Sequence, residues 1–216
     1  MWHVTHMILL LVYCVLGIVV ILRYNGYNSL FKTISLYLAS IIFLEGIKVV
    51  LAFLKLSTVF HYKLQFLMSL FFFFMVVHRF GLTGKRKKYA QLLGLQFAFF
   101  WLLSVMFDRH SSGFPTVLFT SVQFCYILCS LLGLLELLQR TSPIPLTHQG
   151  VFWFFVSHFC FYCYSFLCFG SRSMEQTNNE AIHVYLVLFG NMVLYGVLTV
   201  VMALQNNRYF ARRHDV

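Results

Sequence analysis

Apolar residues run along the chain in seven long segments, and short polar stretches separate them. The segments lie at approximately 4–23, 33–54, 62–80, 89–107, 117–139, 150–170 and 182–205. A helix needs about 20 apolar residues to cross the hydrocarbon core of a bilayer. Turn signals such as Asn25-Gly26 and Pro143-Ile144-Pro145 stand between the segments. The pattern therefore predicts an all-α, polytopic integral membrane helix bundle with seven transmembrane helices, forming a single domain over residues 1–216.

Some of these segments carry polar or aromatic features of their own. A cleaved signal peptide would place basic residues before its apolar core, whereas here the basic residue, Arg23, stands at the far end of the first segment, so we expect a retained helix. Glutamines interrupt the third and fourth segments at Gln65, Gln91 and Gln96. Four consecutive phenylalanines occupy positions 71–74. Such a run points all round a helix, so we expect part of it to face lipid.

The composition agrees with a membrane protein and excludes the common soluble classes. Of the 216 residues 60% are apolar and only 10% charged, with a mean hydropathy of +0.80, whereas soluble domains carry about a quarter charged residues. The six cysteines all lie inside apolar segments, where cysteine behaves as a small hydrophobe. Cys160 and Cys163 have a metal-like spacing, but zinc motifs need a second ligand pair. We therefore predict no metal site. The seventh segment has no lysine that could bind retinal, and His158 alone among the histidines lies well inside a segment, so no cofactor is predicted either.

The placement of lysine and arginine predicts an orientation in the membrane. Eleven of them fall on one side of the seven segments, namely Arg23, Lys32, Arg79, Lys85, Arg86, Lys87, Lys88, Arg140, Arg208, Arg212 and Arg213. Four fall on the other side, namely Lys55, Lys63, Arg109 and Arg172. Cytoplasmic loops carry the excess of positive charge. We therefore expect a multi-pass protein with its N-terminus outside and its C-terminus in the cytoplasm.

The net charge of +10 has a bearing on partners. Because the cations flank apolar segments, anionic lipid on the cytoplasmic side is the expected partner, and nucleic acid is not. The cytoplasmic basic surface has two interpretations. It is formed by Lys85, Arg86, Lys87 and Lys88 with the tail residues Arg208, Arg212 and Arg213. It is either ordinary positive-inside topology or a docking surface for a membrane or cytoplasmic protein partner.

Ionisable residues at membrane depth are expensive and are the first functional candidates. From the helical rise, Glu45 lies about 18 Å and Lys48 about 22 Å from the start of the second segment. The two residues are three apart and can pair on one helix face. Alternatively, Lys48 extends toward the outer interface and leaves Glu45 for another partner.

Other polar residues are expected at a similar depth. His158 lies about 12 Å from the start of the sixth segment and Asn191 about 14 Å from the start of the seventh, with Tyr195 one turn further along. If these helices are neighbours, the residues converge on Glu45 in one intramembrane polar cluster. Such a cluster is either a ligand site or switch, or a buried hydrogen-bond network that fixes helix packing.

Two further residues are expected to act as anchors or helix contacts. Glu136 lies near the cytoplasmic end of the fifth segment, four residues before Arg140, which is a favourable spacing for an ion pair on a helix. Trp153 lies early in the sixth segment, where an interfacial aromatic residue is typical. No nucleophile–base motif, P-loop or H-E-x-x-H sequence occurs in the chain, so no catalytic residue is predicted.

The order of these features resembles the small orphan seven-helix membrane proteins of Bacteroidota. The resemblance rests on Glu45 in the second segment, Glu136 in the fifth, Trp153 in the sixth and Asn191 in the seventh, within stretches such as YILCSLLGLLELLQR and VYLVLFGNMVLYGVLTVVMAL. In plan the chain is also similar to the seven-helix membrane sensor regions of bacterial histidine kinases. That resemblance implies a sensing module, with its output expected on a separate polypeptide because no output domain follows Val216 here.

Together with these resemblances, the sequence favours a non-enzymatic, multi-pass protein of the bacterial inner membrane. We expect it to act as a receptor-like sensory or accessory module that works through partner proteins. A structural subunit of a larger cell-envelope complex is the alternative, with lipid-facing aromatic residues as partner contacts. A membrane lipid-modifying enzyme that uses Glu45 and His158 is a second alternative.

Overall fold

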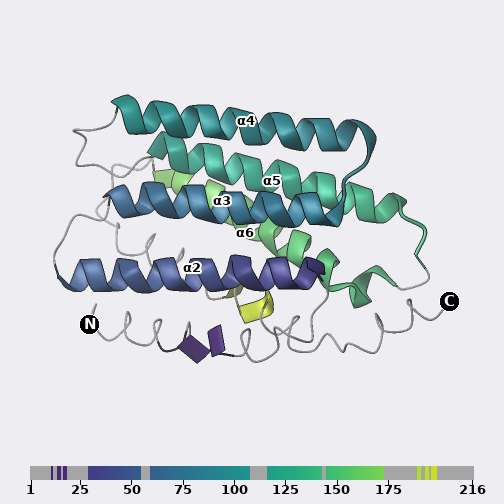
Figure 1. Cartoon of the computed structure of the whole chain (residues 1–216), viewed down its shortest axis with the longest axis horizontal. Coiled ribbons are helices and arrows are strands. Elements are labelled where there is room, and N and C mark those ends of the chain that lie inside the picture. Colours follow the sequence, from purple (N-terminus) through teal and green to yellow (C-terminus); the bar gives the residue numbers. More distant parts are fainter. Residues whose placement is uncertain are drawn as a thin grey trace. The chain divides into compact units, whose positions relative to one another are not determined.

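The described part of the protein is helical, without strands. In the computed structural model, the placed residues are 29–54, 59–107, 116–142 and 145–172, with short pieces within 11–18 and 189–198. The long helices are α2 (Ser29–Phe53), α3 (Val59–Phe80), α4 (Gly84–Phe107), α5 (Thr116–Gln139) and α6 (Gly150–Arg172), and a short 3₁₀ helix, η2 (Leu146–His148), precedes α6 (Figure 1). The all-α prediction is confirmed for these residues.

Four of the described helices are long and apolar enough to cross a membrane. The apolar windows run over Ser29–Lys48 in α2, Lys63–Phe80 in α3, Leu118–Gln139 in α5 and Gly150–Leu167 in α6. The fourth predicted span forms a helix, α4, that is not among these four. Most of the first and seventh predicted spans lies outside the described residues.

The helices α2, α3 and α4 begin three to five residues before the apolar segments that predict them, whereas α6 begins at the same residue as its segment. α4 starts at Gly84, five residues before its apolar segment, and takes in all four cations from Lys85 to Lys88. Lysine and arginine are good helix formers, so the helix extends into the basic stretch although hydropathy detects only the apolar part. α3 starts at Val59 and takes in Lys63, which is buried within the helix and does not lie in a loop.

The chain divides into two compact units, and each is described by itself. The first comprises residues 1–81 and 199–216, and its described long helices are α2 and α3, which pack side by side (Figure 1). Tyr37 contacts Phe73 near the middle of the pair, with ring centroids 6.4 Å apart. Ser29 at the start of α2 accepts a hydrogen bond from Arg79 at the end of α3, so the two helices run antiparallel.

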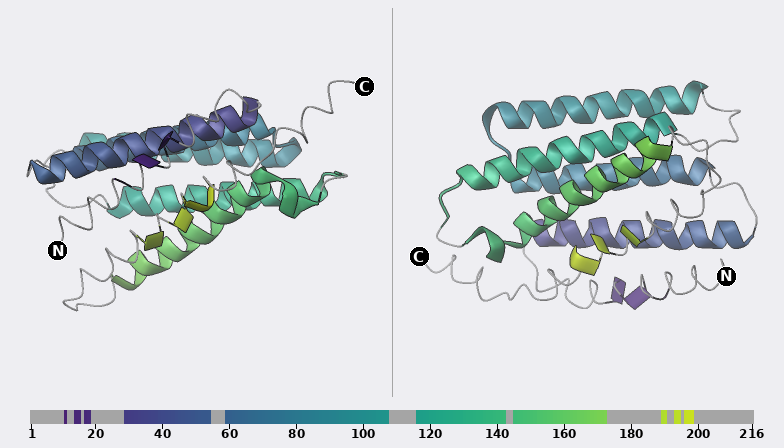
Figure 2. Two further views of the ribbon diagram at one scale, coloured as in Figure 1. Left: turned by 90° about the horizontal axis from the view of Figure 1, so that it is seen from below. Right: turned by 180° about the vertical axis from the view of Figure 1, so that it is seen from behind.

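The second unit comprises residues 82–198 and contains α4, α5 and α6. α5 packs against both α4 and α6 (Figures 1 and 2). α5 and α6 approach closely at Gly133, where an added Cβ would lie only 2.6 Å from the Phe155 ring. Because Gly133 has no side chain, the Phe155 ring fits directly against the α5 backbone, and both residues are buried.

Candidate functional site

The first unit contains a polar cluster centred on Glu45, which is only 4% exposed. Gln65 of α3 donates a hydrogen bond from Nε2 to Glu45 Oε1 over 2.6 Å. Lys48, one turn along α2, forms an ion pair with Glu45 Oε2. Both carboxylate oxygens are therefore engaged, one within the helix and one across the helix pair. We call Glu45, Lys48, His61 and Gln65 the α2–α3 polar cluster.

His61 is the fourth member of this cluster and lies one turn before Gln65 on α3. Its side chain is buried, at 5% exposure, and it forms a hydrogen bond to the backbone of Leu44. Desolvation by burial lowers the pKa of His61 below its usual value, and the charge of Lys48 acts in the same direction. The Leu44 hydrogen bond and the Glu45 charge oppose the shift without cancelling it. The imidazole is therefore neutral at pH 7.

Two buried acceptor atoms of the cluster remain unsatisfied. Within the part of the chain that the structure describes, His61 Nε2 and Gln65 Oε1 have no hydrogen-bond partner. Gln65 already uses its amide nitrogen on Glu45, and a neutral His61 that donates from Nδ1 presents Nε2 as an acceptor. A buried unsatisfied acceptor is costly, which makes the cluster receptive to a hydrogen-bond donor.

His158 belongs to the second unit and is completely buried between α5 and α6. Its Nδ1 lies 2.7 Å from the backbone oxygen of Phe154, one turn earlier, which places the proton of the neutral ring on Nδ1. The rings of Tyr126, Phe154 and Tyr162 surround it at centroid distances of 5.9, 4.3 and 6.1 Å. This environment is that of a core histidine in an aromatic box.

A polar contact between α5 and α6 went unpredicted. Gln123 Nε2 donates to Ser165 Oγ over 2.5 Å, and both side chains are buried. The sequence pattern that could have predicted this contact is the spacing of Gln123, Tyr126 and Ser130, which share one face of α5. Gln123 Oε1 and Ser130 Oγ have no hydrogen-bond partner among the described residues.

Glu136 connects α5 to the start of α4. Arg86 Nη1 donates to Glu136 Oε2 over 2.8 Å, and Arg86 also donates to Gln139. The hydroxyl of Thr83 donates to the same carboxylate at 3.0 Å, and Arg140 lies 3.5 Å away. Glu136 is thus the centre of an interhelical charge cluster, which includes the expected pair with Arg140.

The other predicted site residues either make few contacts or lie outside the described residues. Trp153 is partly exposed and donates from Nε1 to the backbone oxygen of Thr147 over 2.7 Å, which joins α6 to η2. Lys85, Lys87 and Lys88 are exposed, whereas Arg86 is half-buried on Glu136. Outside the described residues lie Asn191, Tyr195, Arg208, Arg212 and Arg213. The predicted convergence of Glu45, His158 and Asn191 stays a prediction.

The described residues contain no group of three or more His, Cys, Asp or Glu that could hold a metal ion. Comparison of the chain with protein-family models, with curated proteins and with solved structures finds no match.

Proposed function

We propose that the chain is a seven-span protein of the bacterial inner membrane, with its N-terminus outside and its C-terminus in the cytoplasm. The four apolar helices support membrane embedding, and the distribution of lysine and arginine supports the orientation. Within that membrane it acts as a receptor-like sensory or accessory module, without chemistry of its own, and transmits its state to partner proteins.

The observation that carries this proposal is the burial of Glu45 on a membrane-length helix beside two unsatisfied acceptors. Ionisable side chains on membrane-spanning helices are expensive and are functional candidates by default. The cluster is neutral overall when Glu45 and Lys48 are paired. A small apolar or lipid-like ligand whose polar end donates hydrogen bonds would satisfy His61 Nε2 and Gln65 Oε1. A change in the partners of Glu45 would then shift α2 against α3.

The experiment measures partner capture by the full-length tagged protein in mild detergent. We expect a stoichiometric partner for the wild type, with its occupancy changed about fivefold or more in Glu45→Gln, the range of ordinary allosteric coupling. Ser69→Ala is the matched control, because Ser69 is a buried polar residue of α3, the helix that packs against α2, and its hydroxyl donates to its own helix backbone at Phe66. It is expected to leave partner occupancy unchanged.

Other outcomes decide against this proposal. A partner held equally well by the wild type and by folded Glu45→Gln indicates a structural subunit of a cell-envelope complex. A monodisperse protein that captures no partner contradicts both the accessory and the subunit roles. Turnover of a phospholipid or isoprenoid that disappears in Glu45→Ala would indicate a lipid-modifying enzyme.

A further inference from the structure

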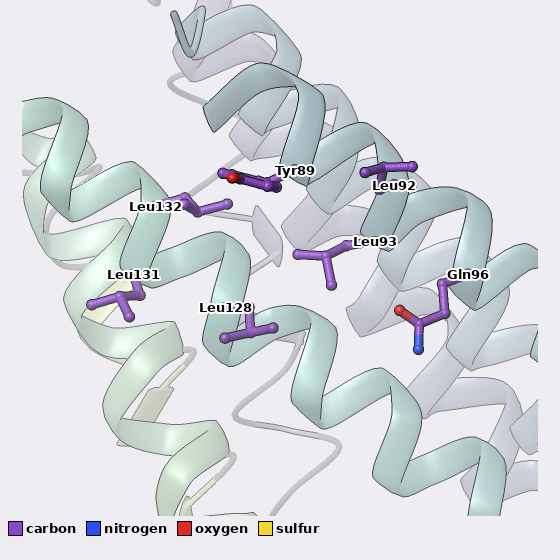
Figure 3. Close-up of a pocket in the computed structure, with 7 residues that line it drawn as sticks. All are labelled: Tyr89, Leu92, Leu93, Gln96, Leu128, Leu131 and Leu132. Atoms are coloured by element: carbon purple, nitrogen blue, oxygen red, sulfur yellow. The ribbon is translucent and has the colours of Figure 1, made fainter. Parts of the chain in front are cut away.

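A groove of about 290 Å³ lies between α4 and α5 in the second unit (Figure 3). Five leucines form most of its wall: Leu92 and Leu93 from α4, and Leu128, Leu131 and Leu132 from α5. Leu92 and Leu131 are substantially exposed, so the groove is open along its length. From Tyr89 at one end to Gln96 at the other it follows α4 for about 10 Å. An open, leucine-lined groove on a membrane protein fits a hydrocarbon chain.

One end of the groove is strongly basic. Lys85 and Lys88 lie on the face of α4 that continues into Leu92, because residues three, four and seven apart share a helix face. Both lysines are exposed. Tyr89 lies between them and the leucines, with its ring in the groove wall (Figure 3). Cations, a phenol and an apolar groove therefore follow one another along a single helix face.

The one carboxylate near this end does not offset the lysines. Among described residues 82–96 and 128–142 there are five cations and one carboxylate, Glu136. Glu136 is buried and already paired with Arg86 and Arg140. Lys85 and Lys88 therefore present uncompensated positive charge beside the opening of an apolar groove.

We propose that this groove, with Lys85 and Lys88 at its mouth, is a binding site for an anionic phospholipid. The acyl chain lies between Leu92, Leu128 and Leu131, and the phosphate meets the two lysines. Basic pockets between helices on the cytoplasmic side are typical sites for anionic headgroups. A second copy of this chain is a poorer occupant, because a two-fold contact would bring the same basic turn against itself. This inference requires α4 and α5 to lie in the membrane and is independent of the role of Glu45.

The test titrates delipidated full-length protein with phosphatidylglycerol and phosphatidylcholine, and counts bound lipid by native mass spectrometry. We expect phosphatidylglycerol to bind about tenfold more tightly than phosphatidylcholine, and K85Q/K88Q to remove most of that preference. K87Q is the matched control. It removes one charge from the same turn, but its position points about 160° away from Lys85 and about 100° away from Lys88 around the α4 axis.

A second variant tests whether the acyl chain lies in the groove. Leu131→Trp fills the wall, so both lipids should bind more weakly, while circular dichroism confirms an intact helical fold. Leu92→Trp provides the same test from α4 if the first variant does not fold. Equal binding of the two lipids contradicts the proposal, as does a loss in K87Q equal to that in the double variant. Full competition by inorganic phosphate would indicate an adventitious anion site, and a dimer lost in Leu131→Trp would indicate a second copy in the groove.

Discussion

At the scale of single residues, Glu136 is the carboxylate with the most polar contacts among the described residues. It accepts hydrogen bonds from Thr83 and Arg86 and lies beside Arg140, so two helices depend on one side chain. Its pair with Arg140 follows from their spacing of four. Its contact with Arg86, 50 residues away, requires α4 and α5 to be adjacent, and spacing along one helix carries no information about that.

Replacing Glu136 with glutamine is expected to destabilise the protein by about 2 kcal/mol, because Arg86 keeps its charge in a half-buried site without a carboxylate. Thermal unfolding of the purified protein in detergent measures the loss. Arg140→Gln is the matched control, since this side chain is 40% exposed and its ion pair is expected to contribute less than about 1 kcal/mol. A larger loss in Arg140→Gln than in Glu136→Gln would contradict this account.

His61 predicts a dependence of stability on pH. Burial lowers the pKa of His61 in the folded protein, whereas an unfolded histidine titrates near its model value of 6.5. Between the two values the unfolded chain binds more protons, so the free energy of unfolding falls as the pH drops from about 7 toward 5. Unfolding followed across this range should show the fall in the wild type and a flatter profile in His61→Gln.

The control for this profile is His78→Gln, which changes an exposed histidine of the same helix. It should keep the pH profile of the wild type. If both histidine variants flatten the profile equally, burial of His61 is not its cause.

At the scale of elements, the α5–α6 contact depends on a small residue facing a large one. Gly133→Ala would place a Cβ 2.6 Å from the Phe155 ring, so either the ring or the helix must move. Overpacking of this kind costs about 1–3 kcal/mol. We expect Gly133→Ala to lower the stability of the protein by that amount in the same unfolding measurement.

Two further variants separate overpacking from a general effect of alanine. Combining Gly133→Ala with Phe155→Leu makes room at the contact, so the double variant should be more stable than Gly133→Ala alone. Gly196→Ala should be neutral or slightly stabilising, because no described atom lies within 4 Å of the new Cβ. Failure of the Phe155 substitution to restore stability would contradict the packing explanation.

The bounds of the helices could largely be predicted from the sequence, and the buried side of each helix could be predicted in part. Predicted and observed bounds agree closely for α5 and α6 because turn signals stand next to the apolar segments there. The phenylalanine run divides as expected: Phe73 is fully buried against Tyr37, while Phe71 is 57% exposed. Which phenylalanine is buried depends on the position of α2, and four consecutive identical residues do not indicate which of them faces that helix.

At the scale of the whole molecule, the topology is the central prediction. α4 is not among the four described helices that are long and apolar enough to cross a membrane, whereas the seven-span prediction places it across. If α4 crosses, positions 87 and 112 lie on opposite sides. Single cysteines at Lys87, Ser112, Thr177 and Arg212 in a cysteine-free background report this through labelling with an impermeant maleimide. We expect Ser112→Cys and Thr177→Cys to react from outside in intact cells.

The other two positions supply the internal comparison. Lys87→Cys and Arg212→Cys are expected to react only after the membrane is permeabilised, because the excess of positive charge stays in the cytoplasm. Labelling of positions 87 and 112 from the same side would show that α4 does not cross, and labelling of position 212 from outside would reverse the C-terminal assignment.

The sequence by itself determined the class of the protein and which residues of one helix are spaced to pair. Long apolar segments require helices in a bilayer, because each helix satisfies its own backbone hydrogen bonds. Spacing within one helix also predicted the Glu136–Arg140 pair, and it gave the Glu45–Lys48 pair as one of two alternatives, the one that the structure contains.

Only the tertiary structure decided which distant residues meet. Gln65 was visible as a polar interruption, yet its bond to Glu45 depends on the alignment of α2 with α3. Arg86 was counted with an exposed basic surface, yet it pairs with Glu136 of α5. Contacts between helices depend on their rotation and register. The pattern of apolar residues is compatible with many arrangements of the helices. The shapes of the side chains and the pairing of buried polar groups select one of them.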